Sequence, residues 1–152
     1  MESLQKGKFV NMNEDEYIKN RLDDQINWYS QKSQFNQKWF KLLQIVEIAS
    51  AAIIPFLAGI GSAFPYYQIL VGSLGVIIAV SAAISSVYKF HENWIEYRTT
   101  AETLKHEKYL YLTKCSPYEG DDSFGNLVQR VESIISKENT QWSRYVEKTK
   151  NT

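Results

Sequence analysis

The most informative absence in this chain of 152 residues is an absence of charge. No Asp, Glu, Lys, Arg or His occurs in the 41 residues from Ile48 to Tyr88. A helix that crosses a bilayer needs about 20 apolar residues, so this run is too long for one crossing and suits two. Gly59, Gly61 and Pro65 mark a turn near its middle. We therefore expect a hairpin of two transmembrane helices, residues 42–60 and 67–88, joined by an external loop at residues 61–66.

Cysteine and net charge are also scarce. The single cysteine, Cys115, excludes an intrachain disulfide. The flanks of the apolar run are balanced, with seven basic and seven acidic residues in 1–47 and ten of each in 89–152. This balance provides no basic face for nucleic acid and no polybasic segment for anionic lipid.

Enzyme motifs are missing as well. The chain contains no H-E-x-x-H, G-x-S-x-G, P-loop or G-x-G-x-x-G pattern. His91 and His106 are 15 positions apart, which is not the spacing of a metal-ligand pair. We expect neither an enzyme nor a bound metal or cofactor.

A soluble protein with a buried apolar hairpin is the alternative to a membrane protein. Small soluble domains rarely contain two adjacent helices that are apolar on every face, and neither segment here shows a polar face. The run also starts too far from residue 1, and is too long, for a cleaved signal peptide. The membrane interpretation is therefore favoured.

The loop charges predict the orientation. The loop carries none, whereas Lys38 and Lys41 precede the first span and Lys89 and Arg98 follow the second. The positive-inside rule then places both termini of this multi-pass protein in the cytoplasm. Aromatic residues stand at the expected interfaces: Trp39, Phe40, Phe64, Tyr66, Tyr67, Tyr88 and Trp94.

The flanks predict long cytoplasmic helices and, with the hairpin, an all-α membrane protein. Asn13 and Glu16 form a capping box that begins a helix over residues 13–41, running without a break into the first span. The second span is expected to continue as a helix over residues 89–115, because apolar residues recur there in a heptad pattern. Pro117 ends that helix. A loop at residues 116–123, a C-terminal helix at 124–148 and a mobile N-terminus at 1–12 complete the prediction.

Two stretches beside the apolar run resemble a known family. They are Arg21–Tyr29 before the membrane and Trp94–Tyr109 after it, the second containing Thr100-Ala101-Glu102. Both are similar to those of a bacterial two-transmembrane family of unknown function, itself similar to the SLATT class of membrane effector domains. The resemblance implies a role as a membrane effector, such as a pore former, in bacterial conflict or signalling, and it implies no enzymatic residues.

Glu47 is the sharpest single feature within the predicted spans. In a hairpin that pairs residue 60 with residue 67, it lies level with Val80 and Ser81. A carboxylate at the bilayer centre costs roughly 2.5–3.5 kcal/mol, and somewhat less off-centre. It either lines a cation path in an oligomer, snorkels to the nearby interface, or forms a packing hydrogen bond with Gln44, Ser81 or Ser85.

Small residues recur in the second span. Gly75, Ala79 and Ala83 have small-xxx-small spacing, which lets helices approach closely. The stripe serves either contact between subunits or packing within the hairpin. Pro55 frees one carbonyl in the first span and can kink it.

A polar cluster is expected in the cytoplasmic helices. Trp94 and Arg98 are one turn apart, as a cation–π pair requires. The cluster is either a structural salt-bridge lattice or a site for a cytoplasmic ligand or partner. Its other members are Arg21, Asp24, Trp28, Glu102 and Lys105.

These features predict a homo-oligomeric membrane pore or ion channel, cation-preferring if Glu47 lines it. The resemblance implies a location in the bacterial cell inner membrane and a role as an effector in bacterial defence or signalling. Two helices cannot enclose a water-filled path, so this function requires several copies. The expected partners are the lipid bilayer, further copies of the chain, and a cytoplasmic sensor protein or small ligand. The alternative is a membrane-anchored helical interaction module that does not conduct.

Overall fold

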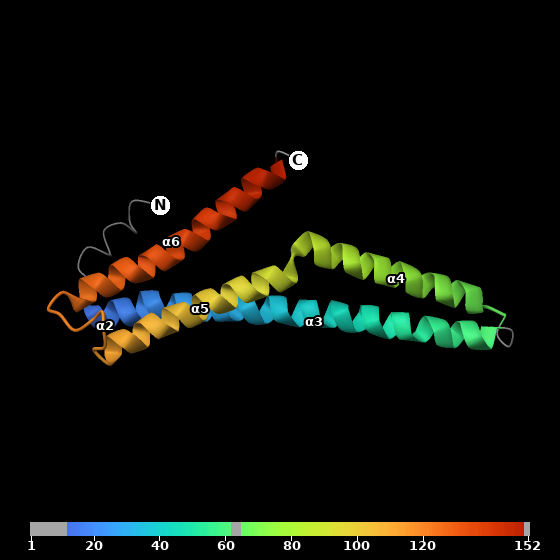
Figure 1. The fold of residues 1–152 in the computed structure, drawn as a ribbon, viewed down its shortest axis with the longest axis horizontal. Coiled ribbons are helices and arrows are strands. Elements are labelled where there is room, and N and C mark those ends of the chain that lie inside the picture. The colour runs from blue at the N-terminus through green and yellow to red at the C-terminus, as the bar shows by residue number, and fades with distance from the viewer. Residues whose placement is uncertain (1–11, 62–64, 151–152) are drawn as a thin grey trace. The chain divides into compact units, whose positions relative to one another are not determined.

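The computed structural model describes residues 12–61 and 65–150, with side chains up to Lys137. All regular structure in these ranges is helical (Figure 1). The sequence predicted a mobile N-terminus at residues 1–12, and residues 1–11 of it lie outside the part that the structure describes. The helices are α2 (Glu14–Tyr17), the π-helical turn η1 (Ile18–Leu22), α3 (Asp23–Ile60), α4 (Tyr67–Tyr88), α5 (Phe90–Leu112) and α6 (Ser123–Lys150).

The chain forms two compact units. The first, here called the terminal unit, consists of Met1–Gln31 and Tyr97–Thr152. The second, the hairpin unit, is Lys32–Glu96. Helices α3 and α5 each contribute residues to both units.

The N-terminal helix begins where its capping residue predicts. The Oδ1 atom of Asn13 accepts a hydrogen bond of 2.8 Å from the backbone N–H of Glu16. One turn later the helix widens into η1, where the N–H of Asp23 bonds to the carbonyl of Ile18 instead of continuing the α pattern. The π turn adds one residue, so Tyr17 and Leu22, five positions apart, both reach the core.

One heptad seam runs from Leu22, the last residue of η1, along α3 to Gly61, which follows the helix. Buried or half-buried positions recur along it in steps of four and three, the spacing of a coiled-coil contact line. A few half-buried residues lie beside the seam: Asp23, Gln25, Ser30, Gln37 and Val46. The seam continues through the charge-free run to the end of the helix. Its members are Leu22, Ile26, Tyr29, Ser33, Asn36, Phe40, Leu43, Glu47, Ser50, Ile54, Leu57 and Gly61.

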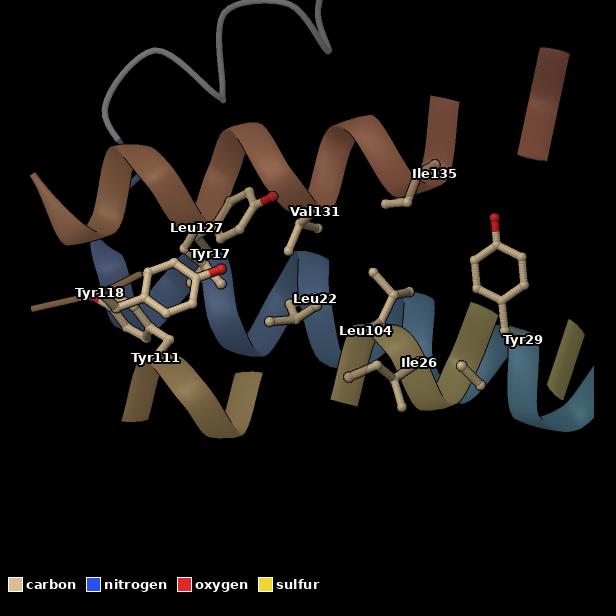
Figure 2. Close-up of a cluster of buried hydrophobic side chains, with 11 residues drawn as sticks. Tyr17, Leu22, Ile26, Tyr29, Leu104, Tyr111, Tyr118, Leu127, Val131 and Ile135 are labelled. Atoms are coloured by element: carbon tan, nitrogen blue, oxygen red, sulfur yellow. The ribbon is translucent and has the colours of Figure 1, made fainter. Parts of the chain in front are cut away.

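The core of the terminal unit is formed by the N-terminal helical segment, α5 and α6. Leu104 of α5 and Leu127 and Val131 of α6 have no exposed surface. Figure 2 shows these side chains facing one another between the helices, with Tyr118 from the α5–α6 connection closing one end. Complete burial of a large aliphatic side chain stabilises by about 1.5–3 kcal/mol relative to exposure, so each of these side chains contributes substantially to the stability of the unit.

The hairpin unit is packed by aromatic rings near one end and, along the rest of its two seams, by aliphatic side chains with serines among them. The ring centroids of Trp39 and Phe90 lie 6.3 Å apart, as do those of Phe40 and Trp94. The Ser33 hydroxyl donates to the carbonyl of Trp94 at 3.3 Å. The residues of α4 that are not exposed lie on one heptad seam: Tyr67, Val71, Leu74, Ile78, Ser81 and Ser85.

The second long helix is broken at Lys89, which corrects the expectation of an uninterrupted continuation. Lys89 adopts the left-handed conformation, with φ of 48° and ψ of 43°, and its N–H bonds to the carbonyl of Ser85. The seam steps by five residues from Ser85 to Phe90, more than an α-helix accommodates on one face. The left-handed residue restores the register, so that Phe90 is buried again.

The connection between α5 and α6 also differs in detail from the expected bounds. Helix α5 ends at Leu112, three residues before the predicted end, and Lys114 beyond it has a positive φ of 52°. Helix α6 begins at Ser123, with the first turn closed by a 3.1 Å bond from the N–H of Asn126 to the carbonyl of Asp122. Its end, Lys150, lies two residues beyond the predicted one.

Candidate functional site

The surface of the hairpin is apolar and uncovered. Two helices, Glu14–Ile60 and Tyr67–Leu112 counted through their irregular turns, are long and apolar enough to cross a membrane. Only 6% of the most apolar 18-residue window of each is buried within the protein. A core helix of a soluble protein would be mostly covered. Large side chains such as Phe56, Ile69 and Val76 are instead more than 60% exposed.

Glu47 lies on the inner seam of α3, between Leu43 and Ser50. Its side chain is half-buried. Among the described residues its carboxylate has no hydrogen-bond or ion-pair partner. The first span therefore carries an uncompensated charge at the residue immediately before the charge-free run begins at Ile48.

The other polar residues predicted at membrane depth separate into two groups. Ser81, only 6% exposed, and the half-buried Ser85 lie on the inner seam of α4. Gln44 is exposed on α3 and stands off the seam. Ser50, which the sequence did not single out, is also only 6% exposed. Serine side chains thus lie on the seams of the hairpin among aliphatic ones, and Ser81 faces the interior.

The small-residue stripe lies on the outside of the hairpin. Gly75, Ala79 and Ala83 are all exposed. A Cβ built on Gly75 would meet no atom within 4 Å. Packing inside the monomer therefore does not require small residues at these positions.

The residues of the predicted cytoplasmic polar cluster do not come together at one place but fall into separate groups. Arg98, Glu102 and Lys105 come together on α5, with both cations 3.2 Å from the Glu102 carboxylate. Trp28 packs edge-on against Tyr97 at 5.8 Å in the terminal unit, and Asp24 is exposed. Trp94 belongs to the hairpin unit, where Lys41 lies 6.0 Å from its ring centroid.

Arg21 has a partner that the sequence did not suggest. Its Nε and Nη2 atoms donate to the two carboxylate oxygens of Glu132 on α6, at 3.0 and 2.9 Å. The Tyr17 hydroxyl donates to the same carboxylate at 3.1 Å. The hydrogen bonds from Arg21 lower the pKa of Glu132, and burial with the nearby negative charge raises the pKa of Tyr17.

Among the residues whose side chains the structure describes, the most deeply buried charge is Glu107 on α5, which is only 5% exposed. Arg130 of α6 donates to both of its oxygens, at 2.8 and 2.6 Å, and the Tyr118 hydroxyl also donates to it. These bonds, the one from Arg130 first, hold the pKa of Glu107 below its ordinary value despite burial. Burial and the neighbouring carboxylate raise the pKa of Tyr118. The triad ties α5, the connection and α6 together.

A hollow of about 530 Å³ opens beside the Arg21–Glu132 pair, within the terminal unit. It is lined by Met12, Tyr17, Arg21, Phe124, Val128 and Glu132. No sequence motif marks it, because its two walls are more than 100 residues apart. Among the residues that the structure describes, no group of three or more His, Cys, Asp or Glu side chains is placed to hold a metal ion.

Comparison with known proteins adds a family without a function. Neither the curated proteins nor the solved structures gave a match. The model of the family described as a protein of unknown function, DUF4231, matches residues 24–124, which include the hairpin and most of both flanking helices. The chain therefore belongs to the DUF4231 family.

Proposed function

We propose that the hairpin inserts into the cell inner membrane and that several copies assemble into a cation-conducting pore. Both flanks lie in the cytoplasm, and the charge-free loop that joins the two spans lies on the external side of the membrane. The protein then acts as a membrane effector, similar to the SLATT class, and responds to a sensor protein or small ligand.

The exposed apolar surface supports insertion. Monomeric soluble proteins rarely expose contiguous apolar patches larger than a few hundred Å². In this hairpin the side chains off the seams are exposed along both helices, over residues 48–60 and 67–88 of the charge-free run. In lipid, an exposed apolar surface has no unfavourable hydration free energy. A helix also hydrogen-bonds its own backbone groups, which lipid could not do.

Glu47 is the observation that carries the conduction proposal. A hairpin that only anchors a protein needs no carboxylate beside its apolar run, and this one has no partner among the described residues. In lipid such a charge requires water, a cation or a further polar group. A ring of Glu47 side chains from several copies would attract cations, as rings of carboxylates do in cation channels.

The exposed stripe supports assembly. Gly75, Ala79 and Ala83 have no packing role within the described monomer, whereas small residues let helices of neighbouring copies approach. Ala79→Leu should therefore weaken the oligomer without preventing insertion, as measured by the mass of nanodisc-embedded particles. Ser73→Leu, which adds bulk at an exposed position about 120° around α4 from Ala79, is the control. Equal masses for both variants and the native protein would assign the stripe no role in assembly.

The decisive functional experiment is electrical. The protein reconstituted in planar bilayers should pass cations in preference to anions, measured as the reversal potential in a salt gradient. Glu47→Gln keeps the shape and removes the charge, so the preference should fall while the particle mass stays constant. Glu92→Gln, an exposed carboxylate on α5, should leave the preference unchanged. An unaltered reversal potential in Glu47→Gln would show that the carboxylate does not line the path.

A membrane-anchored interaction module is the second candidate. It is favoured by the terminal unit, whose core is formed entirely from its own residues and which carries its own hollow. In that case the particle is a monomer in nanodiscs and passes no current. A particle mass of a single copy would therefore decide for the module over the pore.

A further inference from the structure

The hollow in the terminal unit combines an apolar wall with a polar one. Phe124 and Val128 line it from the first turns of α6, and Met12 lines it from just before the start of α2. The phenyl ring of Phe124 meets the ring of Tyr17 edge-on, with 5.8 Å between centroids. The volume of the hollow, about 530 Å³, is within the range of small-molecule sites, roughly 300–1,000 Å³.

The polar wall is an ion pair that is already neutralised. Glu132 accepts from Nε and Nη2 of Arg21 and from the Tyr17 hydroxyl. A guanidinium has five N–H donors and a carboxylate about four acceptor positions, so both groups retain capacity for a further neutral partner. The wall therefore offers donors and acceptors side by side without net charge.

The π turn positions this wall. Arg21 lies within η1 and Tyr17 immediately before it. The added residue allows Leu22 to enter the core while Arg21 and Tyr17 remain at the hollow. Single π turns in α-helices occur frequently at functional sites.

We propose that this hollow is a binding site for a small neutral ligand with a flat apolar body and an amide-like polar edge. The apolar body would lie against Phe124 and Val128, and the edge would bond to the Arg21–Glu132 pair. An anionic ligand would have to compete with Glu132 for Arg21. A cationic ligand would meet the guanidinium of Arg21. The inference concerns binding alone and does not depend on conduction by the hairpin.

Three probes that share a fluorophenyl ring and differ in charge test the proposal. They are 3-(4-fluorophenyl)propanamide, which is neutral, the corresponding propanoate, which is anionic, and the corresponding propylamine, which is cationic. Binding to the full-length protein in nanodiscs is measured by fluorine NMR line broadening. The amide should bind about tenfold more tightly than either charged probe.

Two variants of α6 separate binding in the hollow from partition into lipid. Val128→Trp fills the hollow and should abolish the saturable broadening of the amide. Gln129→Trp adds the same side chain at the neighbouring exposed position and should retain it. Equal broadening in both variants, or no saturable binding of the amide to the native protein, would overturn the site.

Glu132→Gln tests the chemistry of the polar wall without filling the hollow. It keeps the shape and leaves the charge of Arg21 uncompensated, so the preference should change from the amide to the propanoate by about tenfold or more. This change does not depend on whether Val128→Trp folds normally. An unchanged preference would contradict the claim that the neutralised pair sets specificity.

Discussion

The two units of this chain treat polar and apolar side chains in opposite ways. In the terminal unit, aliphatic residues such as Leu104 and Leu127 are completely buried, and the buried charge of Glu107 has three hydrogen bonds. In the hairpin unit, large aliphatic residues such as Ile69 are mostly exposed, and Glu47 has no partner among the described residues. One unit satisfies the rules of a protein in water, and the other does not.

This difference identifies the solvent each unit suits. Amphipathic helices, with one apolar side, are typical of proteins in water, whereas helices that are apolar on every side occur in buried cores or in membranes. The same heptad seam runs along both parts of α3, so the seam alone does not distinguish them. What distinguishes them is the residues off the seam, which are mostly polar or charged up to Lys41 and are apolar from Ile48 to the end of α3.

The largest expected effect comes from the core of the terminal unit. Leu104→Ala removes a fully buried side chain and leaves a cavity, so it should destabilise the unit by about 2–5 kcal/mol. The matched change Ile69→Ala, at a side chain that is 70% exposed on α4, should leave this unit unchanged. Hydrogen exchange of α6 amides in nanodiscs measures the stability. Equal effects of both variants would remove the distinction between the units.

Glu107→Gln should have the next largest effect. It keeps the shape but weakens the bonds from Arg130 and Tyr118, and leaving such groups poorly satisfied costs about 1–3 kcal/mol. Glu102→Gln breaks only exposed ion pairs and should cost about 0–1 kcal/mol. Thermal unfolding followed by near-ultraviolet circular dichroism compares the two. If Glu102→Gln proved the more damaging, the buried triad would not be the tie between α5 and α6.

A smaller, graded effect should follow pH. The folded pKa of Glu107 is lowered from 4.5, so its contribution to stability is complete above that pH and is lost as the pH falls through the lowered value. The pKa of Tyr111 is raised from 10.0 to about 12, by burial first and by Glu14 second. Its contribution is complete below pH 10 and is lost as the pH rises through about 12.

Single variants assign the two sides of this pH profile. Glu107→Gln should flatten the loss of stability in acid and leave the alkaline side unchanged, whereas Tyr111→Phe should flatten only the alkaline side. Unfolding midpoints across the pH range measure both. An acid limb that is the same in Glu107→Gln and the native protein would assign acid sensitivity to other groups.

Much of the fold followed from the sequence because its signals are long or local. The run from Ile48 to Tyr88 predicted two helices long and apolar enough to cross a membrane, and both are present. Asn13 predicted its own capping bond because that contact is only three residues long. The insertion, orientation and pore remain predictions.

The remaining features depend on contacts that the sequence does not display. The π turn at Ile18–Leu22 changes a hydrogen-bond register and leaves no signature in composition. In the sequence, Glu107 looks like one more charged residue on the solvent-facing side of a helix. In the fold, the connection after α5 brings Arg130, which is 23 positions away, into contact with it. Arg21 was predicted to face α5, but Glu132 lies 111 positions along the chain and on α6. Such pairings require the tertiary structure.

The central claim is that the exposed apolar surface of the hairpin faces lipid, and cysteine accessibility tests it most directly. In a Cys115→Ser background, Gln68→Cys and Val76→Cys place one thiol near the loop and one on an exposed position within α4. An impermeant maleimide should label Gln68→Cys in intact bacterial cells. It should leave Val76→Cys unlabelled both in cells and in lysed membranes, until detergent denaturation. Labelling of Val76→Cys in lysed membranes as fast as Gln68→Cys would show that this surface meets water, and would contradict the account.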